Sequence, residues 1–201
     1  MKRIDCLRVL APHVTDEDLV VISLGGTGLE WHAVRPGDNN LFLVAMGCNT
    51  PLALGLAMAL PHRRIVLLET DGSLLLTLGA LATLGNVGPA NLRAFVFDNQ
   101  GYERVRHDVS ATSGRTDLAA VAQACGIGNA CTVRSVEEFT AAADTAMDGS
   151  GLSFVVAKVE PGITDVPPRP GDGTEEKYRF VRHVERLEGR SILAVYRAKL
   201  E

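Results

Sequence analysis

The fold is most evident in residues 64–103, which read RIVLLETDGSLLLTLGALATLGNVGPANLRAFVFDNQGYE. Its two short apolar runs predict buried strands at 64–69 and 92–97. The Leu- and Ala-rich segment between them predicts a helix at 73–84, closed by Gly85. A strand, a helix and a second strand in this order form a βαβ unit, the building block of a parallel sheet.

The same alternation continues on both sides of this unit. Further strands are predicted at 18–24, 41–45, 131–133 and 153–159, and further helices at 4–11, 50–60, 117–125, 136–147 and 175–188. The helix at 136–147 is expected to begin after Ser135, with Glu138 as its capping-box partner. Continuous apolar strands are typical of a parallel sheet that is covered on both faces. We therefore expect an α/β fold with three layers, α/β/α, around a parallel sheet of about six strands.

The end of the chain has a different composition. Residues 161–174, PGITDVPPRPGDGT, are rich in Pro and Gly and predict an extended loop. We expect an α/β domain over residues 1–160. We expect residues 161–201 to pack, as a loop and a helix, on that domain or on a partner chain. Residues 191–196 are expected to add an edge strand or to pair with a partner.

Composition excludes several classes of protein. The chain has 201 residues, 46% of them hydrophobic and 22% charged, which is typical of a globular domain. Its formal net charge of -4 indicates no general affinity for nucleic acid or for an anionic membrane. The first residues lack the pattern of a signal peptide, and no apolar stretch is long enough to cross a bilayer. The four cysteines form no CxxC pair, and without a secretion signal a cytoplasmic protein with reduced thiols is expected.

Polar residues follow two consecutive strands of the predicted sheet. Asp71, Gly72 and Ser73 follow the strand at 64–69, and Asn99 and Gly101 follow the strand at 92–97. In an open parallel sheet, such loops meet beyond the carboxyl ends of the strands, where ligands bind. The Asp71 carboxylate, the Asn99 side chain and the Gly101 carbonyl are oxygen ligands of the kind that Mg²⁺ takes. Amides of Gly72 and Ser73 at a helix start suit a phosphate group. The two loops together predict a diphosphate bridged to the protein through Mg²⁺.

This arrangement resembles the cofactor motif of thiamine diphosphate enzymes, a Gly-Asp-Gly sequence followed some two dozen residues later by Asn-Asn. Here the two parts are TDGS at 70–73 and DNQGY at 98–102, so that Asp71 and Asn99 are retained. Thr70 and Asp98 depart from the pattern. Thr70 would crowd the turn if its φ had to be positive, and Asp98 adds negative charge beside the metal.

The resemblance extends to the preceding segment, LVAMGCNTPLALGLAMALPHRR, and to the Gly25–Gly28 loop. It implies the thiamine diphosphate-binding fold, with Met46 behind the thiazolium, the backbone near Val44 at the pyrimidine amino group, and Thr27 as a hydroxyl donor to the diphosphate. The full set of cofactor-binding residues implied is Thr27, Gly28, Val44, Met46, Gly47, Gly72, Ser73, Asn99 and Tyr102. The implied metal ligands are Asp71, Asn99 and Gly101.

The tail, EPGITDVPPRPGDGTEEKYRFVRHVE, is similar to the ends of phosphonopyruvate and sulfopyruvate decarboxylases. That resemblance implies a small anionic 2-oxo acid as substrate and its non-oxidative decarboxylation to an aldehyde. Arg104 and Arg106 are candidates to attract its anionic group.

A second domain, which binds the aminopyrimidine in this family, cannot fit within 201 residues beside this one. The resemblance therefore implies the β subunit of a split enzyme in a hetero-oligomer such as α₂β₂. The activating glutamate is expected on the α-type partner, and no glutamate of this chain stands out as a substitute.

Two other interpretations remain open. One is half of a different thiamine diphosphate enzyme, such as an acetolactate synthase-like carboligase or an oxidoreductase subunit. The other is a non-catalytic cofactor-binding or scaffold protein, to which the Thr70 and Asp98 departures would point. A plain nucleotide-binding fold is disfavoured because neither GxxxxGK[ST] nor a GxGxxG with a suitable acid is present.

Overall fold

The structure is a computed structural model, and it describes residues 1–42, 45–103, 108–169 and 172–193. Its centre is a parallel sheet of six strands in the order β2-β1-β3-β4-β8-β7. The strands are β1 (Leu19–Ile22), β2 (Asn40–Phe42), β3 (Ile65–Thr70), β4 (Leu92–Asp98), β7 (Ala130–Val133) and β8 (Ser153–Lys158). The three-layer α/β/α fold and the parallel sheet of about six strands are thereby confirmed.

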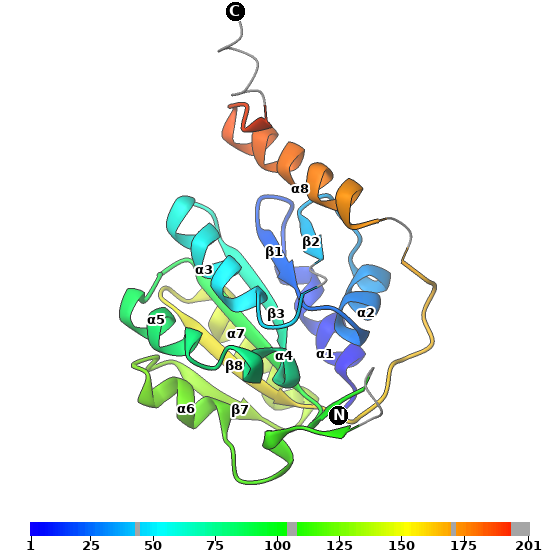
Figure 1. Ribbon diagram of the computed structural model, residues 1–201, viewed down its shortest axis with the longest axis vertical. Helices are drawn as coiled ribbons and strands as arrows, with labels where there is room; N and C mark the ends of the chain where they lie inside the picture. Colours follow the sequence, from blue (N-terminus) through cyan, green and yellow to red (C-terminus); the bar gives the residue numbers. More distant parts are fainter. Residues whose placement is uncertain (43–44, 104–107, 170–171, 194–201) are drawn as a thin grey trace, which may run out of the picture.

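Alternate residues of the strands build a core on each face of the sheet. Ile65 and Leu67 of β3 face one core, and Val66 and Leu68 face the other. The first core is covered by α3 (Asn49–Ala59), α4 (Asp71–Leu76), α5 (Ala80–Val87) and α6 (Leu118–Ala124). The second is covered by α1 (Arg3–Leu10), α2 (Gly26–Val34) and α7 (Val136–Asp148). Figure 1 shows the sheet between these two helical layers.

The order of the strands contains a switch point. From β1 the chain passes to β2 on one side, and then returns to β3 on the other side of β1. These two crossovers, through α2 and α3, therefore lie on opposite faces, and the loops after β1 and β3 part from each other at the carboxyl edge. Ligands of open α/β folds bind in the crevice at such a point.

Two helix predictions need correction. The Gly25–Gly28 segment is not a loop throughout, because α2 begins at Gly26, directly after Gly25 at φ 87°. The single helix expected at 73–84 is two helices, α4 and α5. Gly85 lies inside α5, which ends before Gly88 in the left-handed conformation. Leu and Ala favour a helix throughout this segment, so that composition alone does not reveal the break.

The connection from β4 to α6 holds a small element that we did not expect. It contains an antiparallel hairpin of β5 (Gly101–Tyr102) and β6 (Asp108–Val109), followed by the short 3-10 helix η2 (Ala111–Ser113). Further on, Ser135 caps α7 as predicted, by accepting from the Glu138 amide. The Glu138 carboxylate accepts from the Arg134 amide, not from Ser135.

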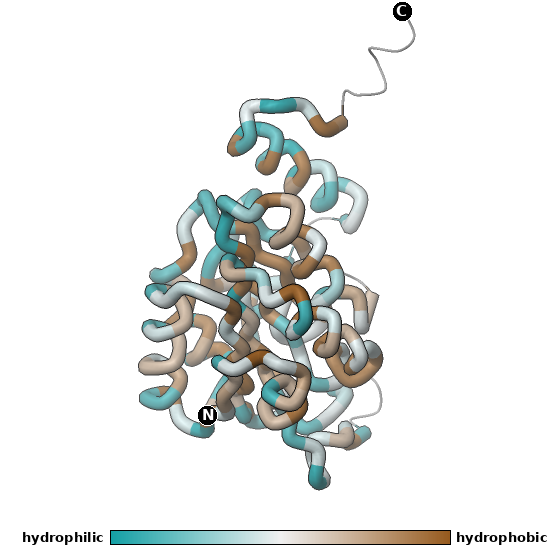
Figure 2. Tube along the Cα trace, turned by 90° about the vertical axis from the view of Figure 1, so that its left-hand side faces the viewer, coloured by the Kyte–Doolittle hydropathy of each residue, from teal (hydrophilic) through white to brown (hydrophobic). Residues whose placement is uncertain are grey.

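The tail runs from the carboxyl end of β8 to the opposite end of the sheet. There α8 (Gly173–Glu188) buries Phe180 and Val184 in the first core. Arg169 lies over the Phe42 ring and pairs with the buried Glu176 of α8. Figure 2 shows α8 at one end of the molecule, with hydrophilic and hydrophobic residues alternating along it. Residues 191–193 form no strand, and residues 194–196 of the predicted edge strand lie outside the described residues.

Within the described residues, no helix has both the length and the apolar character needed to span a membrane.

Candidate functional site

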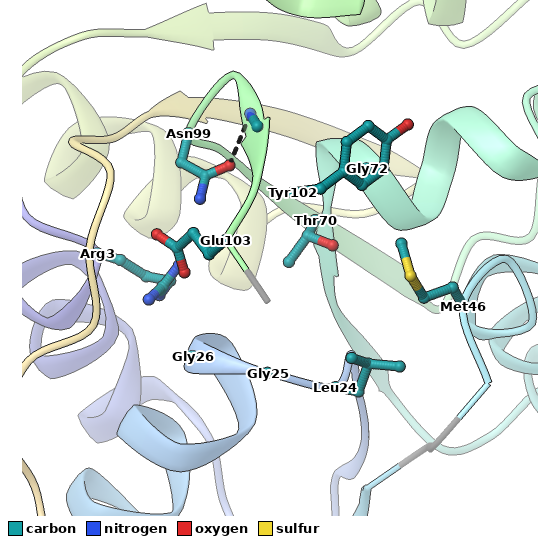
Figure 3. A pocket seen from close by; sticks show the side chains of 11 residues that line it. Arg3, Leu24, Gly25, Gly26, Met46, Thr70, Gly72, Asn99, Tyr102 and Glu103 are labelled. Atoms are coloured by element: carbon teal, nitrogen blue, oxygen red, sulfur yellow. Dashed lines mark hydrogen bonds and ion pairs between the residues drawn. The ribbon is translucent and has the colours of Figure 1, made fainter. Parts of the chain in front are cut away.

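A hollow lies at the carboxyl edge of the sheet, where the loops after β1, β3 and β4 meet. It is lined by residues from five parts of the chain: Arg3, Leu24, Gly25, Gly26, Met46, Thr70, Gly72, Asn99, Gly101, Tyr102 and Glu103. In Figure 3, Arg3 and Glu103 lie together on one side of it and Met46 lies on the other. The hollow therefore occupies the switch point at which the fold predicts a ligand.

Asp71 is fully buried between two residues that line the hollow, Thr70 and Gly72. Its Oδ2 accepts hydrogen bonds from the Ser110 hydroxyl at 2.5 Å and the Thr112 hydroxyl at 3.3 Å. Its Oδ1 is buried and has no hydrogen-bond partner among the described residues. Burial raises the pKa of Asp71, and the charge of Asp98 raises it further, whereas the hydrogen bond from Ser110 lowers it. An unpartnered buried carboxylate oxygen is costly unless something binds it.

Asp98 has a different environment from Asp71, although the two lie close together. Both accept from the Thr112 hydroxyl, at 2.6 Å for Asp98, so their nearest oxygens are within about 6 Å of each other. Asp98 also accepts from the Gln100 amide and pairs with Lys158, the residue opposite it on β8. The negative charge of Asp98 is thus already balanced within the protein.

Asn99 and Gly101 form a tight turn at the edge of the hollow. The Gly101 amide donates to the Asn99 Oδ1 at 3.2 Å, which Figure 3 marks as a dashed line. Gln100 lies between them with a φ of 64°, and it is the one non-glycine residue with positive φ in the described chain. A carbonyl oxygen has two lone pairs, so the Asn99 Oδ1 can accept this bond and still bind a cation.

The departure at Thr70 does not crowd the turn. Thr70 has an extended backbone, with φ -124° and ψ 154°, which any residue adopts. Its hydroxyl accepts from the Ser73 amide and thereby caps α4. Ser73 is fully buried, and its hydroxyl accepts from the Gly47 amide and from Asn49. The Ser73 amide, which we expected to be free for a phosphate, therefore has a partner inside the protein, and so does the Ser73 hydroxyl.

Gly72 and Tyr102 are in direct contact at the hollow. A Cβ on Gly72 would lie 2.7 Å from the Tyr102 ring, so only glycine allows the ring to approach this closely. Met46, on the opposite side, is partly exposed to the hollow. The structure therefore brings together Met46, Gly72, Asn99, Gly101 and Tyr102, as the sequence predicted.

Other predicted residues lie behind the hollow or outside the described chain. Gly47 has a φ of 78° and is fixed to α4 by bonds with Ser73 and Thr77. Thr27 is fully buried in the first turn of α2, and its hydroxyl has no partner among the described residues. Gly28 allows α2 to approach the end of β1, because its Cβ would lie 3.1 Å from the Ser23 carbonyl oxygen. Val44, Arg104 and Arg106 lie outside the described residues.

Sequence reasoning missed an ion pair at the hollow. Arg3 is buried and bonds Glu30, also buried, through Nε to Oε2 at 2.9 Å. Its Nη1 lies 3.6 Å from Glu103, and its Nη2 donates to the carbonyl of Gly162. The carboxylates of Glu30 and Glu103 accept the Thr164 and Gly162 amides in turn. Arg3 thus joins the N-terminal helix, the segment that follows β5 and the tail. No motif marks Arg3 in the sequence.

Glu69 lies beneath the turn between β3 and α4. It accepts from the Asn49 amide, the Thr50 hydroxyl and the Thr70 backbone amide. Burial raises the pKa of Glu69. These bonds engage the carboxylate from three sides, so that Glu69 supports the turn between β3 and α4.

Residues 32–157 match the family described as "Thiamine pyrophosphate enzyme, C-terminal TPP binding domain". The chain is 27% identical to the sulfopyruvate decarboxylase subunit beta of Methanocaldococcus jannaschii, over 92% of this chain and 98% of that one. It is 34% identical to the phosphonopyruvate decarboxylase of Streptomyces viridochromogenes, over 84% of this chain but 42% of that one. The benzoylformate decarboxylase structure from Polynucleobacter necessarius superimposes with a TM-score of 0.70 at 20% identity, covering 83% of this chain and 34% of that chain, which supports the fold.

Proposed function

Because the chain belongs to the thiamine pyrophosphate enzyme family, as its C-terminal TPP-binding domain, we propose that it is the β-type subunit of a split 2-oxo acid decarboxylase. It would bind the diphosphate end of thiamine diphosphate together with Mg²⁺. Its substrate would be a small 2-oxo acid with a second anionic group, of the sulfopyruvate or phosphonopyruvate kind. The single observation that carries this proposal is the buried, unpartnered Oδ1 of Asp71 beside the hollow.

The lengths of the relatives support a split enzyme. This chain covers nearly all of a protein named as a beta subunit, but less than half of a relative named as a whole decarboxylase. A second half is therefore present in the longer relative. We propose that a separate chain supplies that half here, in a hetero-oligomer such as α₂β₂.

The donor set fits a hard divalent cation. We propose that Mg²⁺ is bound by the Asp71 Oδ1, the Asn99 Oδ1 and the Gly101 carbonyl, with diphosphate oxygens completing its coordination. The proposed contacts to the diphosphate are Gly72 and Thr27, whose buried hydroxyl has no partner in the described part of the chain. Ser73 would act indirectly, by holding Gly47 and the turn at Thr70.

The charges around the hollow indicate why a partner is needed. Of the described residues that line it, Arg3 alone is cationic, and it is already paired with Glu30 and Glu103. A diphosphate would bring further negative charge to this place. Mg²⁺ would neutralise part of that charge, and groups on the partner chain would have to balance the rest.

Thiamine diphosphate, when bound, would supply the electron sink that allows a 2-oxo acid to lose carbon dioxide. The residues of this chain would bind, orient and shield the cofactor. Asp71 and Asn99 would fix the metal, and Met46 would pack against the cofactor from the far side of the hollow. Tyr102, in contact with Gly72, would close the hollow above the β3 turn.

Calorimetric titration of thiamine diphosphate with Mg²⁺ tests the proposal. We expect binding when this chain is mixed with a pyrimidine-domain partner, and at least about tenfold weaker binding to the chain alone, because the partner would contribute half of the contacts. The binding should require a divalent cation and vanish when EDTA is added.

Equal binding with and without the partner would contradict the split site. No binding under either condition would favour the non-catalytic alternative.

A further inference from the structure

We propose that Lys158 is a positioning residue for the cation, which it directs to Asp71 by balancing the charge of Asp98. This inference rests on the proposed function, since it concerns the same metal. It explains how a carboxylate is accommodated at position 98, where the resemblance leads one to expect an asparagine.

The register of the sheet sets this pair in place. Asp98 is the last residue of β4 and Lys158 the last of β8, and the two are partners in the parallel ladder. The Lys158 ammonium donates to the Asp98 Oδ2, which is fully buried at the carboxyl edge. Neighbouring side chains at this spacing interact directly, and the buried acid makes the cation necessary.

The hydrogen-bond donors are shared unequally between the two acids. Asp98 receives the Gln100 amide at 3.0 Å, the Thr112 hydroxyl at 2.6 Å and the Lys158 ammonium. Asp71 receives the Ser110 hydroxyl at 2.5 Å and a longer bond from Thr112, both on Oδ2. Ser110 and Thr112 each have one hydroxyl proton, so each acid receives one short bond from the pair. Of the four carboxylate oxygens, the Asp71 Oδ1 is the one without a hydrogen-bond partner among the residues that the structure describes.

In this distribution, hydrogen-bond donors and a cation inside the protein compensate the negative charge of Asp98 in large part. Without Lys158, the carboxylates of Asp71 and Asp98 would lie within about 6 Å of each other in a buried site, with no cation to balance them. A divalent ion would then be attracted by both acids, and Asp98 could take a coordination position that belongs to a diphosphate oxygen. With Lys158 present, the metal is bound by one acid and retains positions for the cofactor.

A charge cycle of three variants tests the proposal: Lys158→Met, Asp98→Asn, and the two combined. Binding of Mn²⁺ without any diphosphate is measured by electron paramagnetic resonance. We expect Lys158→Met to raise Mn²⁺ affinity by about threefold to tenfold, because an unbalanced carboxylate is added near the site. We expect Asp98→Asn to lower it by a similar factor, because the Lys158 ammonium is then unpaired. The combined variant should return to the wild-type value.

Thiamine diphosphate with Mg²⁺, added to this chain and its partner, provides the second readout. Lys158→Met should weaken this binding about tenfold although it strengthens the binding of the bare ion, and the combined variant should restore it. Lys158→Arg, which retains the cation, should resemble wild type in both measurements. If Lys158→Met does not fold, wild-type Mn²⁺ affinity in the combined variant together with weakened affinity in Asp98→Asn supports the proposal.

A merely structural role would give a different pattern. Lys158→Met would then weaken both kinds of binding together, and the combined variant would not restore either, which would overturn the inference. The proposed function fails separately, if wild-type protein shows no Mn²⁺ binding that depends on Asp71, either alone or with partner and thiamine diphosphate.

Discussion

Asp71→Asn is expected to abolish decarboxylation and to weaken cofactor binding in the presence of Mg²⁺ by at least about a hundredfold. Residues that only orient metal ligands typically contribute tenfold to a hundredfold, and a direct ligand should contribute no less. The substitution retains the shape of the side chain but removes the charge that would face the metal. Calorimetric titration and carbon dioxide release, both measured with the partner chain, check this result.

The same substitution should leave the ligand-free protein folded and equally or more stable. Asp71 is buried, and both burial and Asp98 disfavour its charged form. The amide removes that repulsion, as expected of a site that is strained for function. Asp108→Asn, an exposed acid on β6, is the matched control and should bind cofactor like wild type. Loss of binding in both variants, or in neither, would contradict the role of Asp71.

Arg3→Met is expected to lower the free energy of unfolding by about 3–5 kcal/mol. Arg3 and Glu30 are buried to 3% and 1% exposure, and removal of one partner leaves a buried charge without compensation. Loss of the Arg3 guanidinium should also release the tail, because Arg3 bonds Gly162 and its partner Glu30 bonds Thr164. Urea denaturation measures the change.

Two further variants isolate the cause of this loss. Arg8→Met removes an exposed arginine from the same helix, whose ion pair with Asp5 should contribute no more than about 0.5 kcal/mol. The combination of Arg3→Met with Glu30→Gln removes both charges and should recover most of the stability. If Arg3→Met and Arg8→Met lower the free energy of unfolding by the same amount, the buried Arg3–Glu30 pair does not hold the tail.

The sequence predicted the sheet and the loops at its edge because those features depend on local patterns. The centres of strands β3 and β4, IVLL at 65–68 and AFVF at 94–97, are apolar, and parallel strands of this kind are buried on both faces. Asp71 and Asn99 could be placed at one edge because they follow consecutive strands. The family was confirmed by the match over residues 32–157.

The sequence could not predict contacts between distant segments. Arg3 meets Glu103 and Gly162 only through the packing of α1 and the tail, and nothing in its neighbourhood marks it. Prediction of the Lys158–Asp98 pair requires the register of β4 against β8, and strand propensity does not determine that register. The break between α4 and α5 was missed because Leu and Ala favour helix on both sides of it.

The structure bears on two concerns that the sequence raised about the departures at positions 70 and 98. Thr70 has an extended backbone and caps α4, so it does not strain the turn. Asp98 is balanced by a lysine 60 residues further along the chain. The first compensation lies within three residues of Thr70 and the second is 60 residues distant, and both departures fit an intact site better than a degenerate one.

Carbon dioxide release from sulfopyruvate, phosphonopyruvate and pyruvate tests the proposed function, and it is measured after this chain is mixed with a pyrimidine-domain partner, thiamine diphosphate and Mg²⁺. We predict release from at least one of the two dianionic acids, none from either chain alone, and none with Asp71→Asn. Formation of acetolactate from pyruvate as the main reaction would indicate a carboligase instead. A reconstituted pair that binds the cofactor yet releases carbon dioxide from none of these acids would contradict the account.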